Sequence, residues 1–465
     1  MTTTAAPEYR SVDPATGAVG QTFPFIEDGA VEGILATAHE SYKGWRTTPL
    51  VERSRIALRV AELLKDRAED LAALAQAEMG KPREEAVGEV YLCSEIFAYY
   101  ANNAEALLRD QPLETELDGT AVLQSLAIGV VLGVMPWNFP YYQVARFFAP
   151  NLMVGNTVLL KHAESVPRSA LALAALFADA GVPQGVYTNV FANHAQIETI
   201  IEDRRVRGVS LTGSERAGAA VAATAGRALK KCVLELGGSD PFVVLDTPDV
   251  DALAELAWQT RMYNNGQACN SNKRMIVHES IAADFIDALT RRAQAVDLKS
   301  CRPMASRAAA ERLAAIVREA VKQGATLHAG GELAEGPAAL YTPAVLSGVT
   351  SDMRVYHEEL FGPVAVVYSV ADDDAAVDLA NATRFGLGGS VFGTDPARAA
   401  DVATRIDCGM THVNAATAAS RAELPFGGTK GSGFGRELGP TGIHEFTNKR
   451  LYFTAAPAPA SLGRG

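Results

Sequence analysis

Residues 208–238 read GVSLTGSERAGAAVAATAGRALKKCVLELGG. The apolar run at the start of this segment is typical of a strand, and residues 216–228 have the composition and spacing of a helix. A second apolar run ends at Glu235 and is followed by Gly237 and Gly238, and paired glycines mark a turn. A strand, a helix and a strand in this order form a βαβ unit, which is the building block of a parallel sheet.

The same alternation continues on both sides of this unit. Helical spacing covers residues 31–80 and 83–109, and residues 121–135 change to short β-type runs. Further strands are expected over 157–161, 187–191, 241–245, 274–278, 364–368 and 389–392, and further helices over 168–180, 195–203, 250–264, 281–295, 308–323 and 373–382. We therefore predict an α/β protein with two doubly wound domains, joined at the pair of glycines.

The composition is that of a folded chain. The protein has 465 residues, of which 48% are hydrophobic and 21% charged, and this excludes a disordered chain. Its formal charge of −12 has the wrong sign for a nucleic-acid partner, and no basic block indicates a membrane surface. The longest apolar stretch, Leu126–Met135, is about half as long as a membrane span. The first residues show no export signal, so we expect a cytoplasmic protein without nucleic-acid or membrane partners.

The five cysteines form no recognisable framework. Their number is odd, no Cys-x-x-Cys occurs, and the histidines show no ligand spacing, so we predict neither disulfides nor a metal site. Cys269 differs from the others because it lies in a polar, glycine-containing loop, Asn-Asn-Gly-Gln-Ala-Cys-Asn over 264–270. A thiol there could be a nucleophile if a base stands nearby, or it could be a small half-buried residue, as most lone cysteines are.

Three more residues are candidates for a site. Glu235 lies among leucines at a strand end, where burial would raise its pKa towards the general-base range, or it lies on the exposed face of an edge strand. Asn138 lies between two prolines, where its amide could stabilise an oxyanion or simply form the turn. Ser214 follows a strand and opens a helix, whose free N–H groups would suit a pyrophosphate. The glycine-rich residues 431–435 have no clear strand or helix attached, and we interpret them as a loop.

Seven motifs follow one another along the chain. They are Pro-Trp-Asn-Phe-Pro (136–140), a strand end at Lys161, Leu-Thr-Gly-Ser (211–214), Leu-Glu-Leu-Gly-Gly (234–238), Gly-Gln-Ala-Cys (266–269), Glu-Glu-Leu-Phe-Gly-Pro (358–363) and Pro-Phe-Gly-Gly-Thr-Lys (425–430). Together they resemble the aldehyde dehydrogenase superfamily over essentially the whole chain. Within it, LLKHA (159–163) and ALKKCVLELGGSDPF (228–242) look most like bacterial succinate-semialdehyde dehydrogenases.

The resemblance implies a covalent mechanism. Cys269 would attack an aldehyde carbon to give a thiohemiacetal, and the Asn138 amide and the Cys269 backbone N–H would hold its oxyanion. After oxidation to a thioester, Glu235 would activate the water that hydrolyses it. A base at Glu235 argues against a CoA-acylating relative. Retention of these residues together with Glu359 argues against an inactive structural relative.

The resemblance also implies a nicotinamide cofactor. Trp137 and Lys161 match contacts to the adenosine side, and Ser214 matches a pyrophosphate contact. Glu359 and Phe361 match contacts to the nicotinamide ribose and ring.

Glu164 bears on the choice between NAD and NADP. It matches an acid that accepts hydrogen bonds from the adenosine ribose, and a carboxylate repels a 2′-phosphate. We therefore expect NAD to be preferred, with NADP possible because Lys161 and His162 soften the repulsion.

The substrate expectation rests on Arg146. In succinate-semialdehyde dehydrogenases an Arg at this motif position lines the aldehyde tunnel, where a guanidinium can bind a distal carboxylate. Ser420 matches a second contact, and Arg421 and Arg261 rank below it. Alternatively, Arg146 forms an ion pair on a helix surface. Tyr263 stands where some of these enzymes carry a second Arg, which would weaken carboxylate binding.

The family architecture implies domain boundaries and an oligomer. A β arm would pair subunits into a homodimer or homotetramer. The expected parts are 1–115 with 135–236 for cofactor binding, 237–431 for catalysis, and 116–134 with 446–460 for the oligomerisation arm. The loop over 298–304 is shorter than in most relatives, and we expect it to be remote from the nucleophile.

Overall fold

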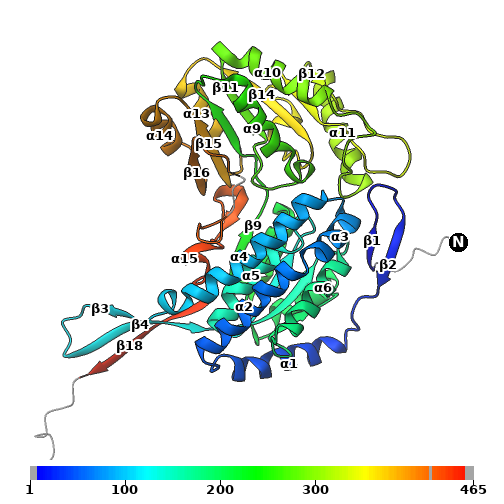
Figure 1. Ribbon diagram of the computed structural model, residues 1–465. Coiled ribbons are helices and arrows are strands. Elements are labelled where there is room, and N and C mark those ends of the chain that lie inside the picture. The colour runs from blue at the N-terminus through cyan, green and yellow to red at the C-terminus, as the bar shows by residue number, and fades with distance from the viewer. Residues whose placement is uncertain (1–7, 418–420, 456–465) are drawn as a thin grey trace, which may run out of the picture.

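The computed structural model of the chain describes residues 8–417 and 421–455. It shows two α/β lobes, each built on its own sheet, and a three-stranded arm that projects away from them (Figure 1). A small hairpin of β1 (Tyr9–Val12) and β2 (Val19–Phe23) lies at one side of the first lobe. The predicted α/β class with parallel sheets is confirmed.

The first lobe is built on a six-stranded sheet with the order β17-β9-β8-β5-β6-β7. Its strands are β5 (Val130–Met135), β6 (Thr157–His162), β7 (Tyr187–Asn189), β8 (Val206–Thr212), β9 (Lys231–Glu235) and β17 (Gly433–Phe434). Strands β5 to β9 run parallel, and β17 is antiparallel to β9. The chain leaves β5 for β6 and β7 on one side and returns to β8 and β9 on the other. Sheets of this kind bind ligands outside the carboxyl ends of the strands, at the point where the strand order reverses.

Eight helices accompany this sheet in the described residues. They are α1 (Ala30–Trp45), α2 (Leu50–Asp66), α3 (Ala68–Met79), α4 (Arg83–Leu107), α5 (Tyr142–Val154), α6 (Pro167–Asp179), α7 (His194–Glu202) and α8 (Glu215–Arg227). Helix α5 is buried along its whole length because it packs against α2, α4 and β5. Its first turn follows Asn138, so the core fixes the position of this residue.

The second lobe is built on a seven-stranded sheet with the order β12-β13-β14-β11-β10-β15-β16. Its strands are β10 (Pro241–Val244), β11 (Arg274–His278), β12 (Thr326–Ala329), β13 (Ala344–Ser347), β14 (Val364–Val370), β15 (Gly388–Phe392) and β16 (Met410–Val413). Its helices are α9 (Val250–Met262), α10 (Glu279–Gln294), α11 (Arg307–Lys322), α12 (Arg354–His357), α13 (Asp373–Asn381) and α14 (Pro396–Thr404). The central strands are apolar on both faces because helices cover both sides of a parallel sheet. No helix in the described ranges is long and apolar enough to cross a membrane.

The arm contains β3 (Gln111–Leu113), β4 (Gly119–Ala127) and β18 (Thr447–Ala455), with β4 in the middle. The predicted arm over 116–134 runs too far, because β5 lies between β6 and β8 in the first sheet. The two strands are separated at Gly129, whose φ is 140°. The Asn156 side chain fixes this break by accepting hydrogen bonds from the backbone N–H groups of Ile128 and Gly129. The sequence does not reveal this break because the apolar run Leu126–Met135 continues across Gly129.

Residues 431–435 do not form the simple loop that the sequence predicts. The short 3-10 helix Lys430–Ser432 leads into β17, which pairs with the end of β9 (Gly433 opposite Glu235). A Cβ on Gly433 would lie 2.0 Å from the Leu234 carbonyl oxygen, so this close approach requires glycine. Figure 1 shows this orange segment returning from the second lobe to the first. This returning segment places β17 beside Glu235 at the edge of the first sheet.

Candidate active site

The loop that carries Cys269 begins with a tight left-handed turn. Helix α9 ends at Met262, earlier than the sequence predicts, and Asn264, Asn265 and Gly266 follow with φ angles of 51°, 53° and 73°. Asparagine and glycine tolerate this conformation better than other residues do. A Cβ on Gly266 would lie 2.3 Å from a backbone carbonyl oxygen, so glycine is required there.

Asn138 connects the first lobe to this turn. Its Nδ2 group donates to the Gln267 carbonyl oxygen (3.0 Å), and its Oδ1 accepts from the Gln143 Nε2 group (2.9 Å). Its own backbone carbonyl accepts from the Asn264 Nδ2 group (2.8 Å). The buried amide is therefore oriented from both sides, which goes beyond turn formation. Because Nδ2 carries two hydrogens, it can donate to one further acceptor.

Cys269 is partly exposed, and its surroundings hold it as a thiol at rest. Burial raises the pKa of Cys269 to about 12; Arg146 and Lys273 oppose this rise, while Glu359 and Glu235 add to it. The thiolate is the nucleophilic form of cysteine. A nucleophilic role for Cys269 would therefore need the loss of its proton.

Glu235 is buried, with 1% of its surface exposed, so the alternative of an exposed edge-strand residue is wrong. Burial raises its pKa well above the usual carboxyl value, and the neighbouring Arg146 charge opposes this only in part. Among the described residues, neither carboxylate oxygen has a hydrogen-bond partner. A Cβ on Gly427 would lie 2.5 Å from Glu235 Oε1, so the glycine leaves the carboxylate its space. A desolvated, unpartnered carboxylate is a stronger base than one in water.

Arg146 lies inside the protein, with 2% of its surface exposed. It does form an ion pair, with Glu437, but this pair is buried and not on a helix surface. Its Nη2 group donates to the Thr212 hydroxyl (3.1 Å), and the guanidinium lies over the Phe426 ring, 4.5 Å from the centroid. The charge also reaches Glu235 and Cys269, since it lowers the pKa of both.

A cavity of about 490 Å³ is lined by residues of both lobes. Its walls include Ser214, Gly237 and Glu359. Ser214 caps α8 by accepting from the Ala217 N–H (3.3 Å), and Glu359 Oε1 accepts from the Gly238 N–H (3.1 Å). The first turn of α8 offers N–H groups and positive dipole for phosphates, and the carboxylate suits ribose hydroxyls. These residues fit a dinucleotide.

A profile of the aldehyde dehydrogenase family matches residues 1–451. The chain belongs to the aldehyde dehydrogenase family. A relative from Deinococcus radiodurans, named succinate-semialdehyde dehydrogenase (NADP+), is 50% identical over 98% of both chains. A protein of the same name from Mycobacterium avium is 40% identical over 98% of both.

Solved structures agree with this membership of the aldehyde dehydrogenase family. Succinic semialdehyde dehydrogenase from Streptococcus pyogenes, solved in complex with NADP+, is similar at a TM-score of 0.93. It is 40% identical, over 96% of this chain and all of the other. The enzyme from Burkholderia pseudomallei gives the same TM-score at 34% identity, over 97% of this chain and 95% of the other.

At the carboxyl end of β6, this aldehyde dehydrogenase pairs Lys161 with Glu164 (Nζ to Oε1, 2.5 Å). Burial raises the pKa of Glu164, but the charge and hydrogen bond of Lys161 outweigh it and lower the pKa overall. His162 is fully buried, its Nε2 lies 2.8 Å from the Pro140 carbonyl oxygen, and burial lowers its pKa to about 4. It is therefore neutral, so of the two predicted residues only Lys161 softens the Glu164 charge, and His194 also acts on this carboxylate.

Trp137, which is expected on the adenosine side, and Phe361, which is expected at the nicotinamide ring, contact each other. Their ring centroids are 5.8 Å apart in an edge-to-face arrangement. Ser420 lies outside the described residues. Tyr263 stacks on Phe139 (5.9 Å between centroids), so it packs against the Asn138 turn.

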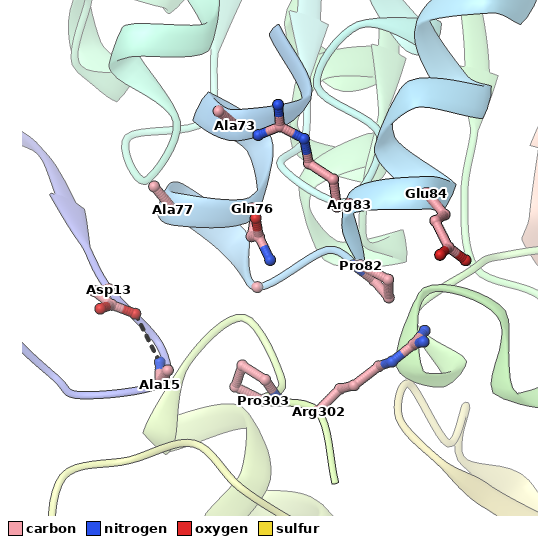
Figure 2. A pocket seen from close by; sticks show the side chains of 11 residues that line it. Asp13, Ala15, Ala73, Gln76, Ala77, Pro82, Arg83, Glu84, Arg302 and Pro303 are labelled. Atoms are coloured by element: carbon pink, nitrogen blue, oxygen red, sulfur yellow. Dashed lines mark hydrogen bonds between the residues drawn. The ribbon is translucent and has the colours of Figure 1, made fainter. Parts of the chain in front are cut away.

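The shortened loop is not remote from the nucleophile, contrary to the sequence expectation. The Arg302 carbonyl accepts from the Asn265 Nδ2 group (3.0 Å), and the Ala305 N–H donates to Gln267 Oε1 (2.8 Å). Figure 2 shows the outer side of this loop, where Arg302 and Pro303 border a pocket of about 450 Å³ together with residues of α3, α4 and the β1–β2 hairpin. This loop therefore packs directly against the left-handed turn over 264–266 that precedes Cys269.

Glu85 on α4, which no motif in the sequence singles out, supports the same turn. Glu85 Oε2 accepts from the Asn264 backbone N–H (2.6 Å), and its Oε1 pairs with the Arg302 guanidinium (2.9 Å). Lys273 and Glu437 were missed as well, since an ordinary charged residue in a sequence gives no sign that it is buried. Their roles follow from contacts between distant segments.

Proposed function

We propose that this aldehyde dehydrogenase oxidises succinate semialdehyde to succinate with NAD or NADP. The observation that carries the substrate choice is the buried guanidinium of Arg146 within electrostatic reach of Cys269. Its contacts with Glu437 and Thr212 use Nε and Nη2. A guanidinium has five N–H donors, so it has capacity for a further carboxylate. The names of the relatives agree with this choice.

In the proposed first step, Cys269 loses its proton to solvent and its sulfur forms a bond to the aldehyde carbon. The carbonyl oxygen becomes an oxyanion, which the second Asn138 Nδ2 hydrogen and the Cys269 N–H stabilise. Arg146 and Lys273 favour the thiolate because both lower the pKa of Cys269. A bound nicotinamide would supply the oxidising power by accepting a hydrogen with its electron pair from the tetrahedral carbon, which leaves a thioester on Cys269.

In the second step, Glu235 removes a proton from a water molecule that attacks the thioester. The carbon–sulfur bond breaks, the acid leaves and Cys269 is regenerated. The raised pKa of Glu235 suits this role, since it makes the carboxylate a stronger base. The partner-free oxygens, the burial of the side chain and the close approach of Gly427 support a base that is shielded from bulk solvent.

For the cofactor, we propose a preference for NAD that leaves NADP usable. Glu164 at the end of β6 disfavours a 2′-phosphate, and its pairing with Lys161 reduces the effect. The relatives' names and the NADP+ complex from Streptococcus pyogenes point towards NADP. Comparing kcat/KM for the two cofactors decides the matter, and equal values would remove the preference.

For the assembly, we propose a homo-oligomer that forms through the arm. Strand β18 carries Leu451, Tyr452 and Phe453 with 62%, 52% and 37% of their surfaces exposed. Exposed apolar side chains on an edge strand favour pairing with another chain. Light scattering of the intact protein and of a chain that ends at Asn448 tests this; an unchanged mass would contradict it.

The proposed activity is tested by formation of reduced cofactor. Purified protein is mixed with succinate semialdehyde and either dinucleotide, and with propanal as an uncharged aldehyde. We expect turnover with both aldehydes and a higher kcat/KM for the semialdehyde. A higher kcat/KM for propanal would contradict the substrate assignment while leaving the family chemistry intact.

A further inference from the structure

Lys273 lies directly behind the nucleophile and is 1% exposed. Its Nζ donates to the carbonyl oxygens of Ala268 and Cys269, each at 2.8 Å, and lies 3.3 Å from Glu359 Oε1. An ammonium has three donors, and here it has three acceptors. The side chain therefore ties the backbone of Cys269 to the carboxylate that lines the dinucleotide cavity.

The charges around Lys273 leave its positive charge only partly compensated. The groups that act on it are Glu359, Arg261, Asp240 and Cys269. Burial lowers the pKa of Lys273 and the Arg261 charge adds to this, whereas Glu359, Asp240 and Cys269 oppose it and favour the ammonium. Asp240 is itself buried, and its pKa is raised to about 7 because of burial. The Lys273 Nζ therefore lies 3.3 Å from one carboxylate, while the second, Asp240, is only part-ionised near neutral pH.

Arg261 does not compete for this position. Its guanidinium donates to the carbonyl oxygens of Val364, Gly266, Leu360 and Gly362 and to the Ser271 hydroxyl. It holds the backbone around the nucleophile turn. The cation bound directly to the Cys269 carbonyl is Lys273.

We propose that Lys273 is a positioning residue that holds a positive charge behind Cys269 and thereby favours the thiolate over the thiol. Glu359 acts as the opposing charge, so the ionisation of the nucleophile depends on the carboxylate that faces the cofactor cavity. The inference rests on the proposed role of Cys269. The groups that act on the Cys269 thiol are Arg146 on α5, Lys273 in the nucleophile loop, Glu359 before β14 and Glu235 on β9.

The physical argument is one of charge in a dry environment. A cation within a few ångströms stabilises an anion more strongly inside a protein than in water, since the effective dielectric constant is lower. Such a neighbour commonly shifts an ionisation by one to three pH units. A compact ammonium can bind two adjacent carbonyl groups and one carboxylate, whereas a planar guanidinium is made for bidentate pairing.

The test measures alkylation of Cys269 by iodoacetamide in the cofactor-free protein. Below the midpoint of thiol ionisation, the rate follows the thiolate fraction, so one pH unit is a tenfold change. We expect Lys273→Met to slow labelling of the Cys269 peptide about tenfold at a fixed pH. Lys273→Arg should recover part of that rate because the charge is retained. Cys269→Ser identifies the labelling of the other four cysteines, and circular dichroism compares the folds.

Glu359→Gln should change the rate of Cys269 labelling in the opposite direction. Gln keeps an acceptor for the Gly238 N–H but removes the charge that raises the pKa of Cys269, so labelling should become several-fold faster. Loosened packing would expose the thiol and accelerate labelling at every pH, whereas a lower pKa moves the midpoint of the pH–rate profile, so the labelling rate is followed across pH. An unchanged rate in Lys273→Met, or slower labelling in Glu359→Gln, would overturn the inference. A failure of the proposed function would appear separately, as full turnover in Cys269→Ser.

Discussion

Arg146 and Glu437 form an ion pair inside the protein, with 2% and 6% of their side chains exposed. The pair joins α5 to the segment that returns from the second lobe, and its guanidinium also acts on Glu235 and Cys269. The single charge of Arg146 therefore acts on three acidic groups, which are Glu437, Glu235 and Cys269. This shared position explains why a substitution of Arg146 must be tested for more than substrate binding.

The first prediction concerns substrate charge. Arg146→Ala should reduce kcat/KM for succinate semialdehyde at least about tenfold more than for propanal, because only the semialdehyde loses an ionic contact. Both rates should also fall, since Arg146 favours the Cys269 thiolate. The matched control is Glu437→Gln, which breaks the same buried pair but keeps the guanidinium and should keep the substrate ratio. Equal losses of kcat/KM for both aldehydes in Arg146→Ala would show that Arg146 does not bind the substrate carboxylate.

The second prediction concerns stability and pH. The folded pKa of Glu235 is raised above its unfolded value by burial, so protonated Glu235 supports the fold at acid pH. This contribution is lost as the pH rises through the folded pKa. Glu235→Gln cannot ionise, and its Tm should exceed that of the natural protein by about 2–4 °C at alkaline pH. The difference should vanish at acid pH, and a difference that grows there would contradict the buried, raised-pKa carboxyl.

The third prediction concerns cofactor choice. Glu164→Gln should raise the NADP-to-NAD ratio of kcat/KM about tenfold, because the charge that repels a 2′-phosphate is gone. Lys161→Met should move the ratio the other way, since the carboxylate loses its counter-ion. Both ratios come from initial rates at saturating aldehyde. If Glu164→Gln leaves the ratio unchanged, the carboxylate does not face the ribose.

The fourth prediction concerns the brace behind the nucleophile turn. Glu85→Ala leaves the Asn264 N–H without its acceptor, which should cost about 1–3 kcal/mol of unfolding free energy and lower kcat. Arg302→Ala is the control, because its partly exposed ion pair with Glu85 contributes about 0–1 kcal/mol. Urea unfolding and initial rates measure the two effects. Equal losses in both variants would mean that the ion pair, and not the bond to Asn264, supports the turn.

Much of the architecture could be predicted from local sequence. Apolar runs and helical spacing marked β6, β8, β10 and β11 with nearly their observed bounds, because buried parallel strands have a distinctive composition. The break at Gly129 was missed because it depends on the side chain of Asn156, which is distant in sequence. The strand β17 was missed for a similar reason: a two-residue strand exists only through its partner β9.

The residues of the candidate site also differ in whether the sequence could predict them. Cys269, Glu235 and Asn138 stand in unusual local contexts, so sequence motifs could single them out. Lys273 and Glu437 are ordinary charged residues until the fold buries them beside the site. A sequence does not show burial of a lone charge, since it results from contacts between segments that are distant in the chain.

The central claim is that Cys269 forms the covalent intermediate and Glu235 releases it. The most direct measurement is rapid mixing of Glu235→Gln with succinate semialdehyde and cofactor, followed by mass spectrometry of the Cys269 peptide. We expect a burst of reduced cofactor, about one per subunit, then slow turnover, with a succinyl thioester on Cys269 and no burst in Cys269→Ser. Unchanged steady turnover in Glu235→Gln, or a burst in Cys269→Ser, would contradict it.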